Sequence, residues 1–323
     1  MSGEVLWKSS VSQMLAAILV FNVAPRALVA PPAATTIVGG GPSGLATAIM
    51  LAQKGFKCIQ VLDRLPAPAA AVDDSVWSDT ARHYLVGLGG RGQRALDEIG
   101  CWEGVVEPFC STVVGRKDWN PGAPVDGGVE RIFTDRPYLT RVIPRDRMVS
   151  VLYEHIRKQY DGTISIRHGV EVTDVVWETT EGEADAEEAV LTVAPCSIEG
   201  GAEYSGSEEC AVDDAPPLEM RTPLLIGADG ARRTIAHAME ADDTNHRTLL
   251  KRFGFGRLDS TRFRVRRFVD TNVRVYKTVP LELPGSWRRD INYSCRTSTV
   301  NFDALPTLDG KLTLILTMIL NLT

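Results

Sequence analysis

A glycine-rich turn between a short apolar strand and a helix is the feature that most constrains the fold of this chain. Residues 35–38 (Thr-Thr-Ile-Val) predict a buried strand, and residues 39–44 read G-x-G-x-x-G. Residues 45–54 predict a helix that Gly55 ends, and residues 58–62 predict a second strand. A complete strand, turn, helix and strand within about thirty residues predicts an α/β fold with a Rossmann-like domain.

The glycines of this turn have separate physical tasks. Gly39 allows the tight turn, Gly41 lets the backbone approach a pyrophosphate, and Gly44 lets the helix pack closely on the sheet. Pro42 and Ser43 lie at the start of the helix, where backbone amides bind an anion. The turn therefore predicts a site for the diphosphate of a dinucleotide.

An acidic residue lies where such a site needs one. Asp63 ends the second predicted strand, 19 residues beyond Gly44, and Arg64 follows it. A carboxylate at this position accepts hydrogen bonds from a ribose diol, which favours an adenine dinucleotide as ligand. Residues 87–92 also fit G-x-G-x-x-G, but no strand-end acid follows them, so we interpret them as a loop before a helix over 94–99.

Composition narrows the class of protein. The 323 residues are 44% hydrophobic with a net charge of −6, which excludes a disordered chain or a coiled coil and argues against a nucleic-acid partner. The six cysteines form no C-x-x-C pair and have no histidine at ligand spacing, so we expect incidental thiols and neither a metal site nor a disulfide scaffold.

Later segments carry a family resemblance. Residues 38–45, then 145–148 (Arg-Asp-Arg-Met) at a helix start, then 227–230 (Gly-Ala-Asp-Gly) resemble the successive motifs of FAD-dependent aromatic hydroxylases, the class A flavoprotein monooxygenases. Residues 92–100 and 275–279 are most similar to kynurenine 3-monooxygenase and its relatives. The resemblance covers roughly residues 35 to 310 and rests on the order and spacing of the motifs.

The resemblance implies cofactors and an activity. The glycine turn would hold the FAD pyrophosphate, Asp63 the ribose, and Arg145 the flavin nucleotide, with Asp229 and Gly230 near the pyrophosphate in a motif associated with both FAD and NADPH. Relatives usually carry Glu at the Asp63 position. They also follow the Asp-Gly pair with Ser and later Arg, whereas this chain has Arg233 and Ala236, and this second difference puts the NADPH contact in doubt. The implied enzyme is an NAD(P)H-dependent monooxygenase that hydroxylates a small aromatic substrate through a flavin hydroperoxide. The cofactor supplies that chemistry, so no protein residue is assigned as a catalytic acid or base.

Three readings of the activity stay open. Besides the monooxygenase, a flavin-dependent reductase or dehydrogenase would use the same scaffold. The third reading is an inactive FAD-binding fragment, because a third flavin motif of the type Gly-Asp-Ala-Ala-His is absent and we expect a truncated chain whose C-terminal part is missing. Arg116 and Tyr138 are the candidates for a substrate carboxylate, and their plainer interpretation is a surface arginine and a half-buried aromatic ring.

The expected organisation follows from these segments. An apolar run at residues 14–21 resembles the hydrophobic core of a signal peptide. It predicts targeting to an organelle by a plastid or secretory route and offers a segment for membrane association. The alternative interpretation is a disordered N-terminal arm in a cytoplasmic protein. We expect antiparallel strands at 163–167, 170–177 and 190–193, and one polar sheet face within the lysine- and arginine-rich segment 251–277. The predicted regions are a leader or arm (1–34), an FAD-binding βαβ region (35–160), strands with an acidic insertion (161–223), a second FAD-motif segment (224–250) and an incomplete substrate-domain sheet, mixed or antiparallel (251–323).

Overall fold

The computed structural model describes residues 34–77, 84–179, 187–197, 211–212, 217–252, 268, 272–297 and 300–321. The predicted leader and most of the segment 251–271 lie outside these residues, so their interpretations stay predictions. The chain divides into two compact units. Unit 1 comprises residues 1–67, 158–201 and 205–267, and unit 2 comprises residues 68–157, 202–204 and 268–323.

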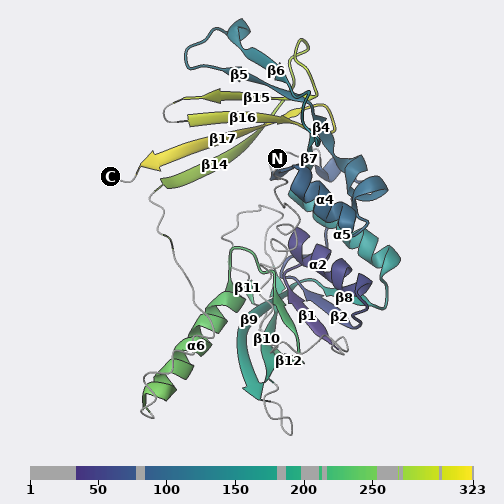
Figure 1. The fold of residues 1–323 in the computed structure, drawn as a ribbon, viewed down its shortest axis with the longest axis vertical. Helices are drawn as coiled ribbons and strands as arrows, with labels where there is room; N and C mark the ends of the chain where they lie inside the picture. The colour runs from purple at the N-terminus through teal and green to yellow at the C-terminus, as the bar shows by residue number, and fades with distance from the viewer. Residues whose placement is uncertain are drawn as a thin grey trace, which may run out of the picture. The chain divides into compact units, whose positions relative to one another are not determined.

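Unit 1 contains the predicted Rossmann-like sheet (Figure 1). Its four strands run in the order β13-β1-β2-β8, and all neighbours are parallel. The strands are β13 (Leu225–Gly227), β1 (Thr35–Val38), β2 (Ile59–Leu62) and β8 (Ile164–Arg167). Helix α2 (Pro42–Gln53) connects β1 to β2, and Gly55 follows it with a φ of +87°, which confirms the predicted helix stop.

A second, antiparallel sheet completes unit 1. Its strands are β9 (Val170–Thr179), β10 (Glu187–Ser197), β11 (Ala211–Val212) and β12 (Leu218–Thr222). Val38 and Leu62 of the parallel sheet share one buried cluster with apolar residues of β9, β10 and helix α6 (Thr234–Arg252). Burial of these side chains joins the two sheets and holds α6 against β9.

Unit 2 holds two further sheets and most of the remaining helices. The three-stranded sheet is antiparallel in the order β3-β7-β4, with β3 (Leu85–Leu88), β7 (Thr140–Pro144) and β4 (Ser111–Val113). Its helices are α3 (Asp74–Trp77), α4 (Gly90–Glu98) and α5 (Arg145–Gln159), with short turns at Trp102–Val106, Glu107–Phe109 and Val125–Gly127.

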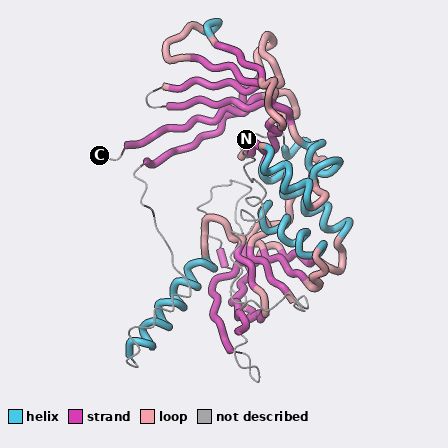
Figure 2. The backbone as a smooth tube through the Cα atoms, viewed as in Figure 1, coloured by secondary structure: helices cyan, strands magenta, loops and turns pink. Residues whose placement is uncertain are grey.

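The larger sheet of unit 2 has six strands. Figure 2 shows them as neighbouring magenta bands. They follow the order β14-β17-β16-β15-β5-β6 and are mixed, since β15 and β5 are parallel and the other neighbours antiparallel. The strands are β14 (Asn272–Leu281), β17 (Leu312–Asn321), β16 (Val300–Pro306), β15 (Ile291–Arg296), β5 (Gly115–Trp119) and β6 (Val129–Ile132). The predicted α/β fold with a mixed second sheet is confirmed.

Three local predictions were wrong. Residues 164–167 pair with β2 in parallel, because this strand follows a helix and returns to the Rossmann-like sheet. Residues 85–88 form a strand and a helix begins at Gly90, where we predicted a loop. The strand is antiparallel to β7, so this second glycine string still lacks the parallel βαβ unit of a dinucleotide-binding site. Cys196 forms a disulfide bond instead of a free thiol, whereas Cys58, Cys101, Cys110 and Cys295 are free, as predicted.

Candidate cofactor-binding site

Gly39 makes the turn that ends β1. Its φ of +107° is a conformation that other residues rarely adopt, and a Cβ at this position would lie 2.2 Å from the carbonyl oxygen of Ala228. The Gly39 N–H donates to the carbonyl of Leu62 at 2.8 Å. The backbone is therefore packed so closely on both neighbouring strands that only glycine fits.

Gly44 lies in the first turn of α2, against the same backbone. A Cβ on Gly44 would lie 1.8 Å from the carbonyl oxygen of Gly39, far inside van der Waals contact. Gly41, by contrast, has an ordinary φ of −69° at the N-cap of the helix. The tight turn predicted for Gly39 and the close packing predicted for Gly44 are confirmed. The role predicted for Gly41 depends on a bound anion and stays a prediction.

The N-terminus of α2 is suited to an anion. Its first intrahelical hydrogen bond runs from Leu45 N–H to the Gly41 carbonyl at 3.0 Å, so the amides of Ser43 and Gly44 have no partner within the helix. Pro42 has no N–H to satisfy, no side chain caps the helix, and its first turn contains no acidic residue. Backbone donors and the positive end of the helix dipole are therefore available for a diphosphate.

Asp63 lies beside this turn at the carboxyl end of β2. Its Oδ2 accepts a hydrogen bond from the Gly40 N–H, and its Oδ1 accepts one from the Leu65 N–H at 2.7 Å. A carboxylate has about four acceptor positions. Each oxygen therefore keeps one position for a ribose hydroxyl while the backbone fixes the orientation of the side chain.

His168 is a neighbour of Asp63 that sequence reasoning did not predict. It follows β8, the strand beside β2, and its ring is close enough to Asp63 to feel that charge. Burial lowers the pKa of His168, and the nearby Asp63 carboxylate and a backbone contact to Leu65 offset part of this effect. The imidazole is therefore neutral at pH 7. Recognising residues 164–167 as the next parallel strand would have placed it here.

The segment after β13 lies against the Gly39 turn. β13 is parallel to β1, and the Ala228 N–H donates to the Val38 carbonyl at 2.7 Å. Asp229 Oδ2 accepts from the Ile235 N–H of α6 at 3.1 Å, and Gly230 has a φ of +66°. The structure thus brings the predicted Asp229 and Gly230 to the carboxyl edge of the sheet that holds the glycine turn and Asp63.

A family model described as "FAD binding domain" matches residues 33–278. The chain belongs to this FAD-binding family. The residues present fit the adenosine diphosphate half of FAD, because unit 1 offers free helix amides for a diphosphate and an oriented carboxylate for a ribose.

Comparisons with individual proteins show the same fold at low sequence identity. The chain is similar to p-nitrophenol 4-monooxygenase PnpA from Pseudomonas putida DLL-E4 (TM-score 0.55, 14% identity, 90% of this chain and 58% of that chain). It is also similar to the flavin-dependent monooxygenase PieE (TM-score 0.56, 18% identity, 91% of this chain and 44% of that chain). A further relative is the tRNA biosynthesis bifunctional protein MnmC of Verminephrobacter eiseniae (strain EF01-2), 34% identical over 109 residues, which are 31% of this chain and 17% of that protein. The chain therefore spans less than two thirds of the length of each of these proteins.

Three further predicted site residues, Arg145, Arg116 and Tyr138, lie in unit 2. Arg145 begins α5, and its Nη1 lies 2.7 Å from Oδ1 of the buried Asp146. Arg116 Nε lies 2.8 Å from Asp118 Oδ2 in an ion pair without hydrogen-bond geometry. Tyr138 packs on Gly90, so the structure gives it and Arg116 different neighbours. The roles of these three residues stay predictions.

Arg232, which follows the Asp229 and Gly230 pair closely, has an acidic partner. Its Nη1 lies 2.6 Å from Glu171 Oε1. Among the described residues, no group of His, Cys, Asp or Glu side chains is arranged to hold a metal ion. Nor does the described part of the chain contain a helix with the length and hydropathy of a membrane span.

The free thiols of this FAD-binding chain should differ in reactivity. Burial raises the pKa of Cys101 to about 11 and that of Cys110 to about 12, whereas Cys58 is exposed. At pH 8 only about one thousandth of Cys101 is thiolate, and the thiolate is the reactive form. We expect iodoacetamide to label Cys58 in the folded chain and to spare Cys101 and Cys110 until urea is added, as read by peptide mass spectrometry. Equal labelling of all three without urea would contradict the packing.

Proposed function

We propose that this chain binds FAD as part of an NADPH-dependent monooxygenase that hydroxylates a small aromatic substrate. The observation that carries the proposal is that one site contains both the uncapped N-terminus of α2, which suits a diphosphate, and the oriented Asp63 carboxylate, which suits a ribose. Both lie in a segment that matches an FAD-binding family. The names of PnpA and PieE as monooxygenases support the reaction class.

In this proposal the residues of the chain bind and orient the cofactor. The amides around Gly41, Pro42, Ser43 and Gly44 hold the diphosphate, and Asp63 holds the ribose with Arg64 beside it. Asp229 and Gly230 complete the carboxyl edge next to the diphosphate, with NADPH using the same loop. Bound FAD supplies hydride acceptance and oxygen activation.

Three residues of unit 2 complete the proposal. Arg145, whose guanidinium is oriented by Asp146, contacts the flavin nucleotide. Arg116 and Tyr138 bind a carboxylate or phenol group of the substrate. No protein acid or base is assigned, because the protein's tasks are position and exclusion of water.

Flavin binding and oxygen consumption test the proposal. We expect the purified chain to quench FAD fluorescence with one-to-one stoichiometry and to bind FMN at least about tenfold more weakly, because FMN lacks the adenosine that Asp63 holds. NADPH oxidation that is accelerated by an aromatic acid and consumes oxygen would support the monooxygenase.

Other outcomes separate the alternatives. NADPH oxidation that proceeds with an organic acceptor and without oxygen uptake would favour a reductase or dehydrogenase on the same scaffold. FAD binding without any NADPH oxidation would favour an FAD-binding fragment. Equal affinity for FAD and FMN would contradict the assignment of Asp63.

A further inference from the structure

His168 is a titratable residue beside Asp63 to which the proposed function gives no task. The backbone of Asp63 fixes its position. The Asp63 N–H donates to the carbonyl of Arg167 at 2.9 Å, and the Asp63 carbonyl accepts from the Val170 N–H at 3.1 Å. These hydrogen bonds lie on either side of His168, so the pairing of β2 with β8 continues past both strands and holds His168 beside Asp63.

The residue after His168 is held as well. Gly169 has a φ of +67°, which other residues rarely adopt. Its N–H donates to the Leu65 carbonyl at 3.1 Å, and its carbonyl accepts from the Cys196 N–H of β10 at 2.8 Å. The Leu65 N–H donates in turn to Asp63 Oδ1 at 2.7 Å. The Asp63 carboxylate and the backbone that carries the imidazole therefore form one hydrogen-bonded unit.

The polar atoms of the His168 ring are shielded from water. Both ring nitrogens are buried. Burial lowers the pKa of His168 below its ordinary value of 6.5, and the Asp63 carboxylate, which favours the charged ring, offsets part of this effect. The ring is therefore neutral at pH 7 and takes up a proton as the solution becomes acidic.

Asp63 is the charged side chain that acts on this ring among the residues that the structure describes. The other charged residues nearby along these strands are Arg64, Arg167 and Glu171. Arg167 is exposed, so water and salt screen its charge, and Glu171 Oε1 lies 2.6 Å from Arg232 Nη1. The imidazolium that forms in acid therefore has the Asp63 carboxylate as its counter-ion.

We propose that His168 makes FAD binding sensitive to acid, because its imidazolium binds the Asp63 carboxylate in competition with the ribose of FAD. This coupling rests on the proposed function, since it requires that FAD bind at Asp63. Each Asp63 oxygen already accepts one backbone hydrogen bond, which leaves about two of its four acceptor positions. A neutral imidazole has one N–H donor and an imidazolium has two. Protonation thus adds a donor that occupies a position the ribose needs.

The direction of the effect follows from linkage between the proton and FAD. If protonated His168 excludes the ribose, bound FAD must lower the pKa of His168 by the same coupling free energy. The affinity for FAD is therefore complete above the pKa that His168 has in the free chain. It decreases as the pH falls through that pKa, by at most about tenfold for each pH unit, because one proton is involved.

Isothermal titration calorimetry of the full chain at pH 8 and at pH 5 tests the coupling, with FAD and with ADP as ligands. We expect both ligands to bind about tenfold more weakly at pH 5. Because ADP contains no flavin, a parallel loss places the effect at the adenosine diphosphate half. Binding at pH 5 should also release protons, which titrations in two buffers of different ionisation enthalpy measure. A histidine with only a structural role would not produce this release.

Two histidine variants locate the effect. In His168→Gln the ratio of the affinities at pH 8 and pH 5 should be close to one, because glutamine does not titrate. His237→Gln is the matched control and should keep the tenfold ratio, because His237 is an exposed histidine on α6 of the same unit. Circular dichroism at both pH values verifies that each variant is folded. If His168→Gln does not fold, proton release by the wild-type chain decides the question.

Different results would overturn different claims. No FAD binding at pH 8 would contradict the proposed function, and the coupling with it. FAD binding at pH 8 with equal affinity at pH 5 would overturn the coupling alone. So would a tenfold loss that persists in folded His168→Gln. Tighter binding at pH 5 would also overturn it, because the imidazolium would then attract the diphosphate instead of competing with the ribose.

Discussion

Replacement of Gly44 by valine is expected to weaken FAD binding by at least about a hundredfold, which is about 2.7 kcal/mol. The Cβ alone would lie 1.8 Å from the Gly39 carbonyl oxygen, and this neighbour is backbone that is itself packed on Ala228. Relief requires that α2 move away from the turn, which displaces the amides of Ser43 and Gly44 from the diphosphate. FAD fluorescence titration measures the loss, and thermal unfolding should show destabilisation of about 1–3 kcal/mol.

Gly89→Val is the matched control for this change. Gly89 belongs to the other G-x-G-x-x-G string and lies at the N-cap of α4, with a φ of −84° and nothing within 4 Å of an added Cβ. We expect little change in FAD affinity and a small change in stability. Loss of FAD binding in Gly89→Val, or its retention in Gly44→Val, would contradict the assignment of the site to α2.

The first βαβ unit was predictable because all its signals are local. The apolar strand, the glycine turn, the helix and the strand-end Asp63 follow one another within 29 residues. The strand at 164–167 was misread because its four residues alternate like an antiparallel strand, and its partner β2 lies about a hundred residues earlier. Strand partners that far apart are decided by tertiary packing, which periodicity does not report.

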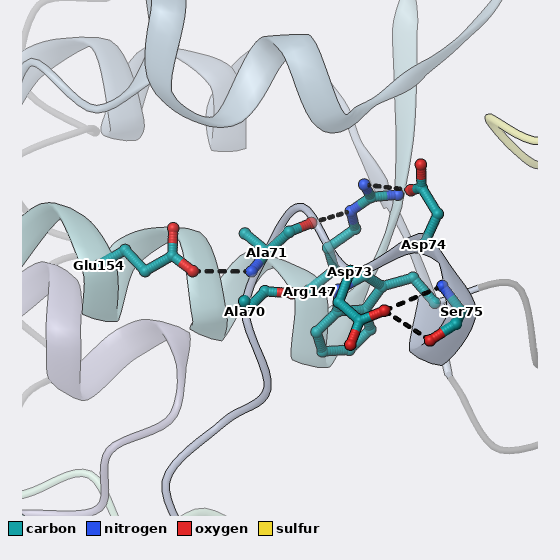
Figure 3. A network of polar contacts seen from close by, with 8 residues as sticks. Ala70, Ala71, Asp73, Asp74, Ser75, Arg147 and Glu154 are labelled. Carbon is teal, nitrogen blue, oxygen red and sulfur yellow. Dashed lines mark hydrogen bonds and ion pairs between the residues drawn. The ribbon is translucent and has the colours of Figure 1, made fainter.

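The candidate sites show the same limit. Asp229 lies beside the Gly39 turn because β13 pairs in parallel with β1. The family resemblance indicated this position, but residue spacing alone does not predict it. The burial of Arg147 shows this for a single side chain, because its hydrogen bonds run to Ala71 and Asp74, which lie 76 and 73 residues away along the chain (Figure 3).

Asp63→Asn is expected to weaken FAD binding by about tenfold to a hundredfold, the usual cost of losing hydrogen bonds to a charged group. The carboxylate accepts amide hydrogen bonds on both oxygens, from Gly40 and from Leu65. In asparagine an NH2 group replaces one of the two carboxylate oxygens. One of the two backbone N–H groups would then face another donor, and the side chain would lose its orientation. The charge that strengthens the ribose hydrogen bonds is lost as well.

Asp63→Glu separates the charge from the shape. It keeps a carboxylate at the end of β2, and relatives with glutamate there lead us to expect FAD affinity within about tenfold of wild type, a difference of about 1.4 kcal/mol. Titration with ADP, which contains only the adenosine diphosphate half, should show the same order of variants as FAD. If Asp63 only supported the Gly40 turn, Asp63→Asn would lower the unfolding temperature while ADP still bound the folded variant normally. Parallel losses of ADP and FAD affinity in a folded Asp63→Asn variant would instead require direct contact between the carboxylate and the ribose.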